Sequence, residues 1–329
     1  MTLALFILII LAFVFLVGTC IGSFLNVVVL RAFSDESICF PGSKCPSCQK
    51  PLKWYHNIPI LSFLILKGKC AFCESKISVQ YPVIELLTGI FFLLVFLKFG
   101  LTLNSLFVLF FGSLFIVIAA TDIKEKVVFD VHTYVLVGAG LIYNLFNIGN
   151  LYQGNQIIHL GSFFLGINNS FIASILGILA GIVIMEAFAR FGYLVAGTRA
   201  FGEGDTYIAA GLGAIFGLQY LITILIYSFI IQIFLTIPVF VKKIYENKDF
   251  KTLSSFLVFF LLIIIIKYMD YTSIARNMLI FGLLTLLLCV VGIYLCKRIL
   301  GGLKEKNTPT YLPFGPAMVV AALILIFIN

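Results

Sequence analysis

Charged side chains are scarce in this chain. Asp, Glu, Lys and Arg make up 11% of its 329 residues, whereas hydrophobic residues make up 62%. A soluble domain is normally about half apolar and about a quarter charged, so a single buried core cannot hold this excess of apolar side chains. The shortage of charge therefore excludes an ordinary soluble protein and predicts a chain that lies mostly in lipid.

Residues 1–30 lack the features of a cleaved signal peptide. Their apolar stretch is longer than the hydrophobic region of a signal, no basic residue precedes it, and no small-residue cleavage site follows it cleanly. We therefore expect this segment to remain as a first transmembrane helix.

Apolar runs of about 20 residues are long enough to cross a bilayer as helices. They recur along the whole chain, so we expect an all-α polytopic membrane protein with about eight to ten transmembrane helices. The expected spans are residues 3–30, 82–98, 102–121, 127–148, 170–190, 205–218, 219–241, 253–268, 276–296 and 312–328.

Lysines and arginines gather in alternate loops between these spans. If the N-terminus is outside, 19 of the 22 Lys and Arg residues lie on the cytosolic side. Cytosolic loops of membrane proteins carry such an excess, so residues 31–81 are predicted to form a cytosolic domain and residues 149–169 an external loop. The net charge of +8 then reflects topology, and we expect membrane lipid but no nucleic acid as a partner.

The spans and loops divide the chain into five parts. A first transmembrane helix covers residues 1–30, and a cytosolic four-cysteine domain covers residues 31–81. A transmembrane core follows over residues 82–241. Residues 242–310 are expected to add a transmembrane hairpin, and residues 311–329 form a further transmembrane helix.

Two cysteine pairs stand in the cytosolic segment, Cys45 with Cys48 and Cys70 with Cys73. This spacing is close to that of a four-cysteine zinc ribbon. Zinc prefers four thiolates in a tetrahedron, and each pair places two sulfurs on one side of it. Two disulfides or redox-active thiols are the alternatives, which a cytosolic location disfavours. The pattern predicts a structural Zn²⁺ site that stabilises a domain with a small core.

Two aspartates lie at the cytosolic edge of expected spans. Asp122 ends the third span, and Asp205 begins a later span directly after Gly202 and Gly204. Ionisable groups at such positions are candidates for function. A paired site would hold one protonated and one ionised carboxylate, which together can activate water against a peptide bond. A boundary charge at Asp122 and a helix cap at Asp205 are the alternatives.

Other acidic residues permit weaker interpretations. Glu85 could bind the new amine of a cut substrate or a residue of the substrate. It could equally be a buried carboxylate that is hydrogen-bonded near the start of a span. Asp130 is expected to cap or orient the fourth helix near the site. Glu186 is expected to be a snorkelling or paired charge.

Several motifs resemble the bacterial prepilin peptidases, the type IV leader peptidase family of A24 aspartyl proteases. The matching motifs are GSFLNVVV from Gly22, both cysteine pairs, WYHNIPILS from Trp54, ELLTG from Glu85, Asp122 and Asp130 at the family's spacing, GEGD from Gly202 and PFGP from Pro313. The resemblance covers about residues 1–240 and 311–329.

The resemblance implies a membrane-embedded aspartic endopeptidase that removes the leader of type IV prepilins or pseudopilins at the cytosolic membrane face. It also implies N-methylation of the new N-terminal residue with S-adenosylmethionine, in the inner membrane of bacteria that assemble type IV pili or type II secretion systems. Asp122 and Asp205 would be the catalytic pair, with Gly202, Gly204 and Asp130 in supporting roles.

Some residues depart from the family pattern. Thr206 and Tyr207 stand where the family usually has Val-Lys, and Phe129 stands where it usually has proline. These departures keep a noncatalytic assembly protein as a competing function, and the carboxylates within the membrane keep an ion-coupled transporter as another. No glycine-rich nucleotide loop is evident in the sequence, so methyl transfer rests on the resemblance alone.

Overall fold

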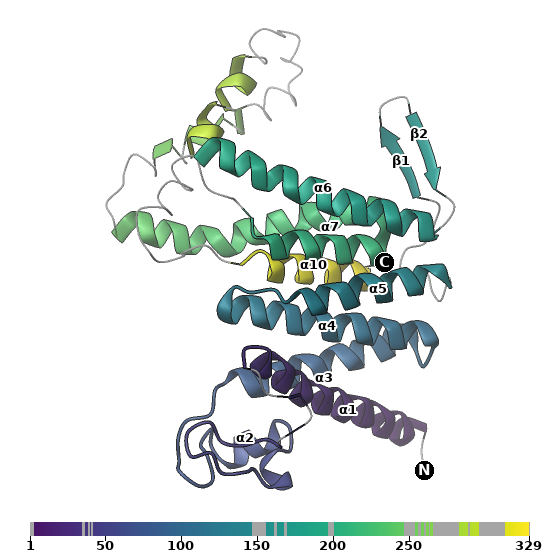
Figure 1. Cartoon of the computed structure of the whole chain (residues 1–329), viewed down its shortest axis with the longest axis vertical. Helices are drawn as coiled ribbons and strands as arrows, with labels where there is room; N and C mark the ends of the chain where they lie inside the picture. Colours follow the sequence, from purple (N-terminus) through teal and green to yellow (C-terminus); the bar gives the residue numbers. More distant parts are fainter. Residues whose placement is uncertain are drawn as a thin grey trace.

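The chain forms a stack of long helices with a small cysteine-containing module at one end (Figure 1). The architecture comes from a computed structural model. It describes residues 3–34, 37–38, 40, 42–146, 156–160, 163–167, 170–196, 201–246, 254–255, 258–259, 261–262, 264–265, 283–288, 290–295 and 313–328. The helices of the stack are α1 (Leu3–Arg31), α3 (Gln80–Phe99), α4 (Leu103–Glu125), α5 (Asp130–Leu145), α6 (Ser170–Ala196), α7 (Glu203–Glu246) and α10 (Gly315–Ile328).

Within the described residues, five helices are long and apolar enough to span a membrane, namely α1, α3, α4, α6 and α7. The shorter α5 and α10 pack among them. The helical, multi-pass architecture is thus confirmed. Only parts of the expected spans at residues 253–268 and 276–296 are among the described residues.

The expected spans at residues 205–218 and 219–241 form the single helix α7, which is broken at Gly217. Gly217 has φ 72° and ψ 179°, a conformation that favours glycine. A break of this kind frees backbone carbonyls, which need partners inside a membrane. Asn144 of α5 supplies them, because its Nδ2 donates to the carbonyls of Ala214 at 2.9 Å and Ile215 at 3.0 Å.

One hairpin departs from the all-helical expectation. Strands β1 (Gln156–Leu160) and β2 (Phe163–Ile167) pair antiparallel within the predicted external loop. Their isoleucines and phenylalanines have high strand propensity, and the short segment between them permits a hairpin.

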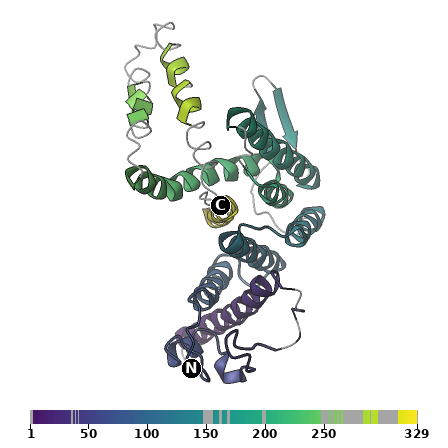
Figure 2. The ribbon, with the colours of Figure 1, turned by 60° about the vertical axis from the view of Figure 1, so that its left-hand side comes forward.

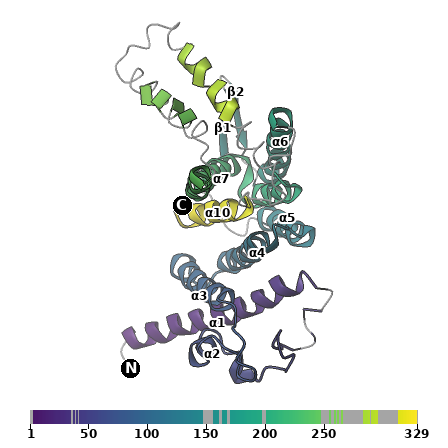
Figure 3. The ribbon, with the colours of Figure 1, turned by 90° about the vertical axis from the view of Figure 1, so that its left-hand side faces the viewer.

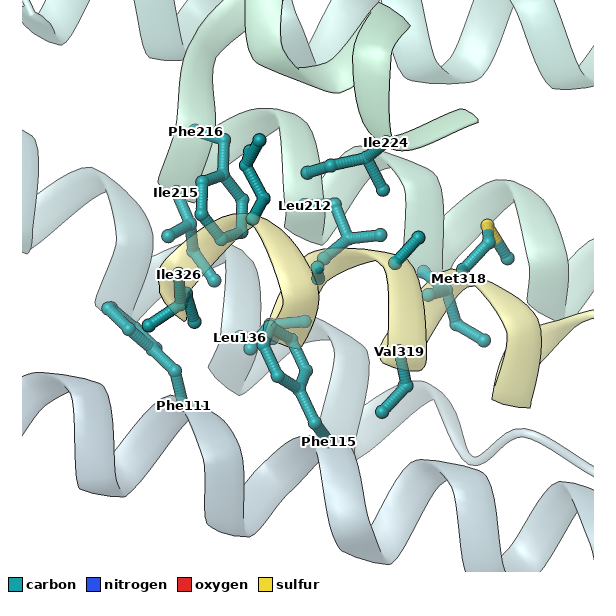
Figure 4. Close-up of a cluster of buried hydrophobic side chains, with 14 of the residues drawn as sticks. Phe111, Phe115, Leu136, Leu212, Ile215, Phe216, Ile224, Met318, Val319 and Ile326 are labelled. Atoms are coloured by element: carbon teal, nitrogen blue, oxygen red, sulfur yellow. The ribbon is translucent and has the colours of Figure 1, made fainter. Parts of the chain in front are cut away.

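Helix α10 lies in the middle of the bundle, between α4 and α7 (Figure 2). The core around it is apolar and fully buried, and it includes Phe115 of α4, Leu136 of α5, Leu212 of α7 and Met318 of α10 (Figure 4). This packing places the N-terminus of α10 beside the end of α4 and the start of α7.

The N-terminal half is organised around α1 and α3, which lie side by side next to the cysteine module (Figure 3). Glycines bring the two helices close. A Cβ atom at Gly22 would lie 2.8 Å from the Cα of Glu85, so only glycine fits at this crossing. The module contains the short helices η1 (Trp54–His56) and α2 (Leu61–Ile65).

Candidate active site and metal centre

Asp122 and Asp205 are brought together from opposite ends of two helices. Asp122 lies in the last turn of α4, and Asp205 lies in the first turn of α7. Their exposed fractions are only 5% and 8%. The charge of Asp122 acts on Asp205, so the two carboxylates share one electrostatic environment. Two buried carboxylates in such a site do not ionise independently.

Each aspartate accepts one hydrogen bond from a backbone amide. The N–H of Gly202 donates to Oδ2 of Asp205 at 3.1 Å, and the N–H of Gly315 donates to Oδ2 of Asp122 at 3.1 Å. No described residue hydrogen-bonds to either Oδ1. The two carboxylates therefore have one fixed oxygen each and a second oxygen available to water or substrate.

Gly315 brings α10 into the site. A Cβ atom there would lie 2.4 Å from Oδ2 of Asp122 and 3.0 Å from Cδ1 of Ile208, so a larger residue would displace the carboxylate. The PFGP motif that contains Gly315 is visible in the sequence, but its role is not, because 193 residues separate it from Asp122.

The two glycines before Asp205 have different surroundings. A Cβ atom at Gly204 would lie 2.6 Å from Cβ of Val128, so this glycine allows α7 to approach the loop between α4 and α5. A Cβ atom at Gly202 would find no atom nearer than 3.7 Å. The contribution of Gly202 in the structure is its amide, which holds Asp205.

Two further predicted residues lie at the periphery. Asp130 does not cap α5 as expected, because Phe129 is the N-cap residue; Asp130 is exposed and is the first residue of the helix, where a carboxylate is favourable to the helix dipole. Glu186 forms an ion pair with Arg190, one turn later in α6, at 3.1 Å.

Thr206, the residue after Asp205, has a buried hydroxyl without a partner. Its exposed fraction is 8%, and no described group hydrogen-bonds to its Oγ1. The neighbouring Tyr207 packs edge-on against Tyr134 of α5, with ring centroids 6.0 Å apart. The two departures from the family pattern thus place a buried hydroxyl directly after Asp205 and an aromatic ring against α5.

The two cysteine pairs form matching knuckles. The amide of Cys45 donates to the carbonyl of Lys50 at 3.0 Å, and the amide of Cys70 donates to the carbonyl of Ser75 at 2.9 Å. Gln49 follows Cys45 by four residues and has a φ of 57°. Glu74 follows Cys70 by four residues and has a φ of 55°. The two loops therefore present their sulfur atoms with the same backbone geometry.

All four thiols converge on one point. The Sγ atoms of Cys45, Cys48, Cys70 and Cys73 lie within 4.8 Å of one another, and those of Cys45 and Cys73 are 3.9 Å apart. None of the four is in a disulfide. Thiolates at about 2.3 Å from a tetrahedral zinc ion would be about 3.8 Å apart. These four cysteines could therefore hold a metal ion, and their softness suits zinc.

The structure favours the thiolate at Cys45 and Cys73, whereas, against a backbone hydrogen bond at Lys50, burial and hydrogen bonds with Cys73 and Cys45 raise the pKa of Cys48 to about 11. A hydrogen bond from the backbone of Cys48 is the main reason that the pKa of Cys45 is lowered to about 6. The Ser75 hydroxyl lies 3.1 Å from Sγ of Cys73 and is the main cause of the lowered pKa of Cys73. The lowered pKa values of Cys45 and Cys73 thus come mainly from backbone hydrogen bonds and Ser75.

Glu85 is also buried, with 6% of its surface exposed. Its Oε2 accepts a hydrogen bond from the amide of Ile60 at 2.8 Å, and the Ser23 side chain bonds to it as well. Ser23 and Ile60 belong to motifs that the sequence displays, but nothing in their spacing indicates this contact.

Comparison with known proteins agrees with the motifs. Residues 16–99 match the sequence model of the bacterial peptidase A24 N-terminal domain, and residues 109–237 match that of the type IV leader peptidase family. No solved structure matches the chain.

Three relatives named "Prepilin leader peptidase/N-methyltransferase" are similar to the chain. The protein of Neisseria gonorrhoeae is 32% identical over 69% of this chain and 81% of its own length. The Klebsiella pneumoniae protein is 33% identical over 63% of this chain and 86% of its own length. The Myxococcus xanthus protein is 34% identical over 66% of this chain but only 59% of its own length. From its two matched domains, its helical membrane architecture and these relatives, we conclude that the chain belongs to the type IV leader peptidase family.

Proposed function

We propose that this protein is a membrane-embedded aspartic endopeptidase that removes the leader peptide of type IV prepilins or pseudopilins. The observation that carries the proposal is the buried pair of Asp122 and Asp205, where the end of α4 lies near the start of α7. The names of the relatives supply the substrate class.

In the proposed reaction, one aspartate is ionised and the other is protonated. The ionised carboxylate takes a proton from water, and the water oxygen attacks the peptide carbonyl. The protonated carboxylate donates a hydrogen bond to the carbonyl oxygen, where negative charge develops. The amides of Gly202 and Gly315 hold both carboxylates in position during these steps.

We place this reaction at the cytosolic membrane face. Lysine and arginine counts favour an external N-terminus and a cytosolic cysteine module. The end of α4 that carries Asp122 lies on the same side as the module, because Lys124 lies over the ring of Phe33, two residues beyond α1, at 5.1 Å. A substrate could then keep its apolar helix in lipid while its leader stays in the cytosol.

We further propose Zn²⁺ as the metal of the four-cysteine cluster. The ion would hold the two knuckles together and so stabilise a module with few buried residues. N-methylation of the new N-terminus with S-adenosylmethionine is also proposed, because the names of the relatives include this activity. We also propose a bacterial inner-membrane location, which the bacterial origin of the relatives and the five apolar helices among the described residues support.

The test is cleavage of a purified prepilin in liposomes by the wild type, Asp122→Asn and Asp205→Asn, with mass spectrometry of the product. We expect the wild type to cut after the leader and both variants to lose at least about 1,000-fold in rate, since each removes one half of the acid–base pair. Glu125→Gln is the matched control, because Glu125 is an exposed carboxylate in the same last turn of α4. Cutting that survives in either asparagine variant would refute the pair, and a wild type that cuts no prepilin would refute the proposed function.

A further inference from the structure

A cavity of about 640 Å³ separates the cysteine module from the ends of the membrane helices. Its walls include Val27 of α1, His56 of the module, Tyr81 and Glu85 of α3, and Lys124 of α4. This volume is typical of a site for a small molecule or the end of a chain, and such sites often lie between domains. The cavity is separate from the aspartates but reaches the last turn of the helix that carries Asp122.

Glu85 is the one carboxylate among the residues described as lining the cavity. It is 94% buried, since its exposed fraction is 6%, and it makes no ion pair within the described part of the chain. A buried carboxylate without a cation is costly in free energy. A site that retains one is therefore suited to a ligand that brings positive charge.

Arg31, Lys44, Lys76 and Lys124 also line the cavity, but none of them forms an ion pair with Glu85 within the described residues. The guanidinium of Arg31 donates to the backbone carbonyls of Ser37 and Ile38, and Lys124 lies over the ring of Phe33. Both side chains are thus directed to other groups in the described structure.

A strained turn orients Glu85. Ile60 has φ 61° and ψ −50°, and the amide of Leu61 donates to the carbonyl of Pro59 at 2.6 Å. This is a γ-turn with positive φ, which is rare and unfavourable, and more so for a β-branched residue. The turn directs the Ile60 amide onto Oε2 of Glu85 at 2.8 Å. Strain of this kind is concentrated at functional sites, where it fixes the geometry of a group.

We propose that this cavity binds the α-ammonium group of the cut product, with Glu85 as its counter-ion. The inference rests on the proposed function, because cutting creates a primary ammonium at the membrane edge where Asp122 lies. An uncut substrate has a neutral amide at the same position, so an ammonium site distinguishes product from substrate. The new N-terminus needs to move only from the end of α4 into a cavity that α4 itself borders.

Binding of peptides to the full-length protein in detergent tests this assignment without any cutting. The probes are a short peptide with the mature N-terminus of a prepilin and the same peptide N-acetylated. The wild type should bind the free-amine peptide about tenfold more tightly, which corresponds to one charge-assisted contact. In Glu85→Gln this ratio should fall below about twofold, although the glutamine oxygen still accepts from Ile60.

Glu74→Gln is the charge-matched control, because Glu74 is an exposed carboxylate in the same module, and it should keep the wild-type ratio. Butylammonium should compete with the free-amine peptide on the wild type, whereas butanol should not. This second measurement needs no variant that could misfold.

Equal binding of the two peptides by the wild type would overturn the assignment, as would an unchanged ratio in Glu85→Gln. Glu85→Gln could instead keep the wild-type ratio between the two peptides and lose affinity for S-adenosylhomocysteine, the demethylated form of the methyl donor. That result would also overturn the assignment, because Glu85 would then bind the methyl donor. If the protein binds the free-amine peptide selectively but cuts no prepilin, the proposed endopeptidase function is refuted and the ammonium site at Glu85 is not.

Discussion

The amide of Gly315 donates a hydrogen bond to Oδ2 of Asp122 at 3.1 Å, across 193 residues of sequence. The contact joins the start of α10 to the end of α4 and leaves no space for a side chain, since a Cβ atom at Gly315 would lie 2.4 Å from that oxygen. The position of Asp122 therefore depends on a helix far away in the sequence.

Gly315→Ala should displace the Asp122 carboxylate. Because a misplacement of about 1 Å can lower a rate about 100-fold, we expect a loss of that size in the rate constant for prepilin cutting. Single-turnover cleavage in liposomes measures it. Gly138→Ala is the control, because a Cβ atom at Gly138 of α5 meets no atom within 4 Å. An active Gly315→Ala enzyme would show that this contact does not position Asp122.

Thr206→Val should stabilise the protein. The valine has a similar shape and removes a buried hydroxyl that has no partner, so the free energy of unfolding should rise by about 1 kcal/mol. Unfolding in mixed detergent micelles measures this change. Thr206→Ser keeps the hydroxyl and should show no gain. A destabilised valine variant would mean that the hydroxyl has a partner in the membrane, such as an ordered water.

Asn144→Leu should weaken the bundle at the break in α7. The carbonyls of Ala214 and Ile215 would lose their donor in an apolar environment, which costs about 1–3 kcal/mol for each unsatisfied buried group. The same unfolding assay applies, with Ser113→Ala as control. Ser113 bonds only to the Leu109 carbonyl of its own helix, so its loss should have little effect. Equal stability of the two variants would contradict the role of Asn144.

The cysteine module should contain one metal ion per protein, and the ion should be absent from Cys70→Ser. Elemental analysis of the purified protein measures both. Removal of the ion with a chelator should make the module easier to denature, and Trp54, the only tryptophan of the chain, reports the change by its fluorescence. A protein that binds no metal, or a module unaffected by the chelator, would refute a structural metal.

The metal-free module should lose stability as the pH falls. Folding lowers the pKa of Cys45 from 9.0 to about 6, so the folded state holds fewer protons than the unfolded state between these values. The stabilisation from the Cys45 thiolate is complete above pH 9.0 and is lost as the pH falls to about 6. Denaturation followed by Trp54 fluorescence across this range should show the decline, and a flat profile would contradict it.

Much of the architecture follows from local sequence features. The cysteine spacing predicted the cluster, and apolar runs predicted the helices, because both depend on residues that are neighbours in the chain. The boundary expected near residue 218 corresponds to the break at Gly217. The catalytic role of Asp122 and Asp205 remains a prediction, although the structure brings the two carboxylates together.

Other parts of the site could not be read from the sequence. The Gly315 amide acts on Asp122 only through the packing of α10 between α4 and α7, which no local pattern encodes. The conformation of Ile60 is equally hidden, because a β-branched residue is not expected at positive φ. The contribution of Ser75 to the thiol cluster depends on how the two knuckles meet.

The placement of α10 has a consequence for biogenesis. A ribosome that adds about 5–20 residues per second needs roughly 10–40 seconds to pass from Asp122 to Gly315. During this interval α4 and α7 can already be in the bilayer, but Asp122 has not yet received its amide donor. The nascent chain therefore cannot hold both aspartates in their final positions until residues 313–328 have been inserted, which delays proteolysis until the surrounding bundle has assembled.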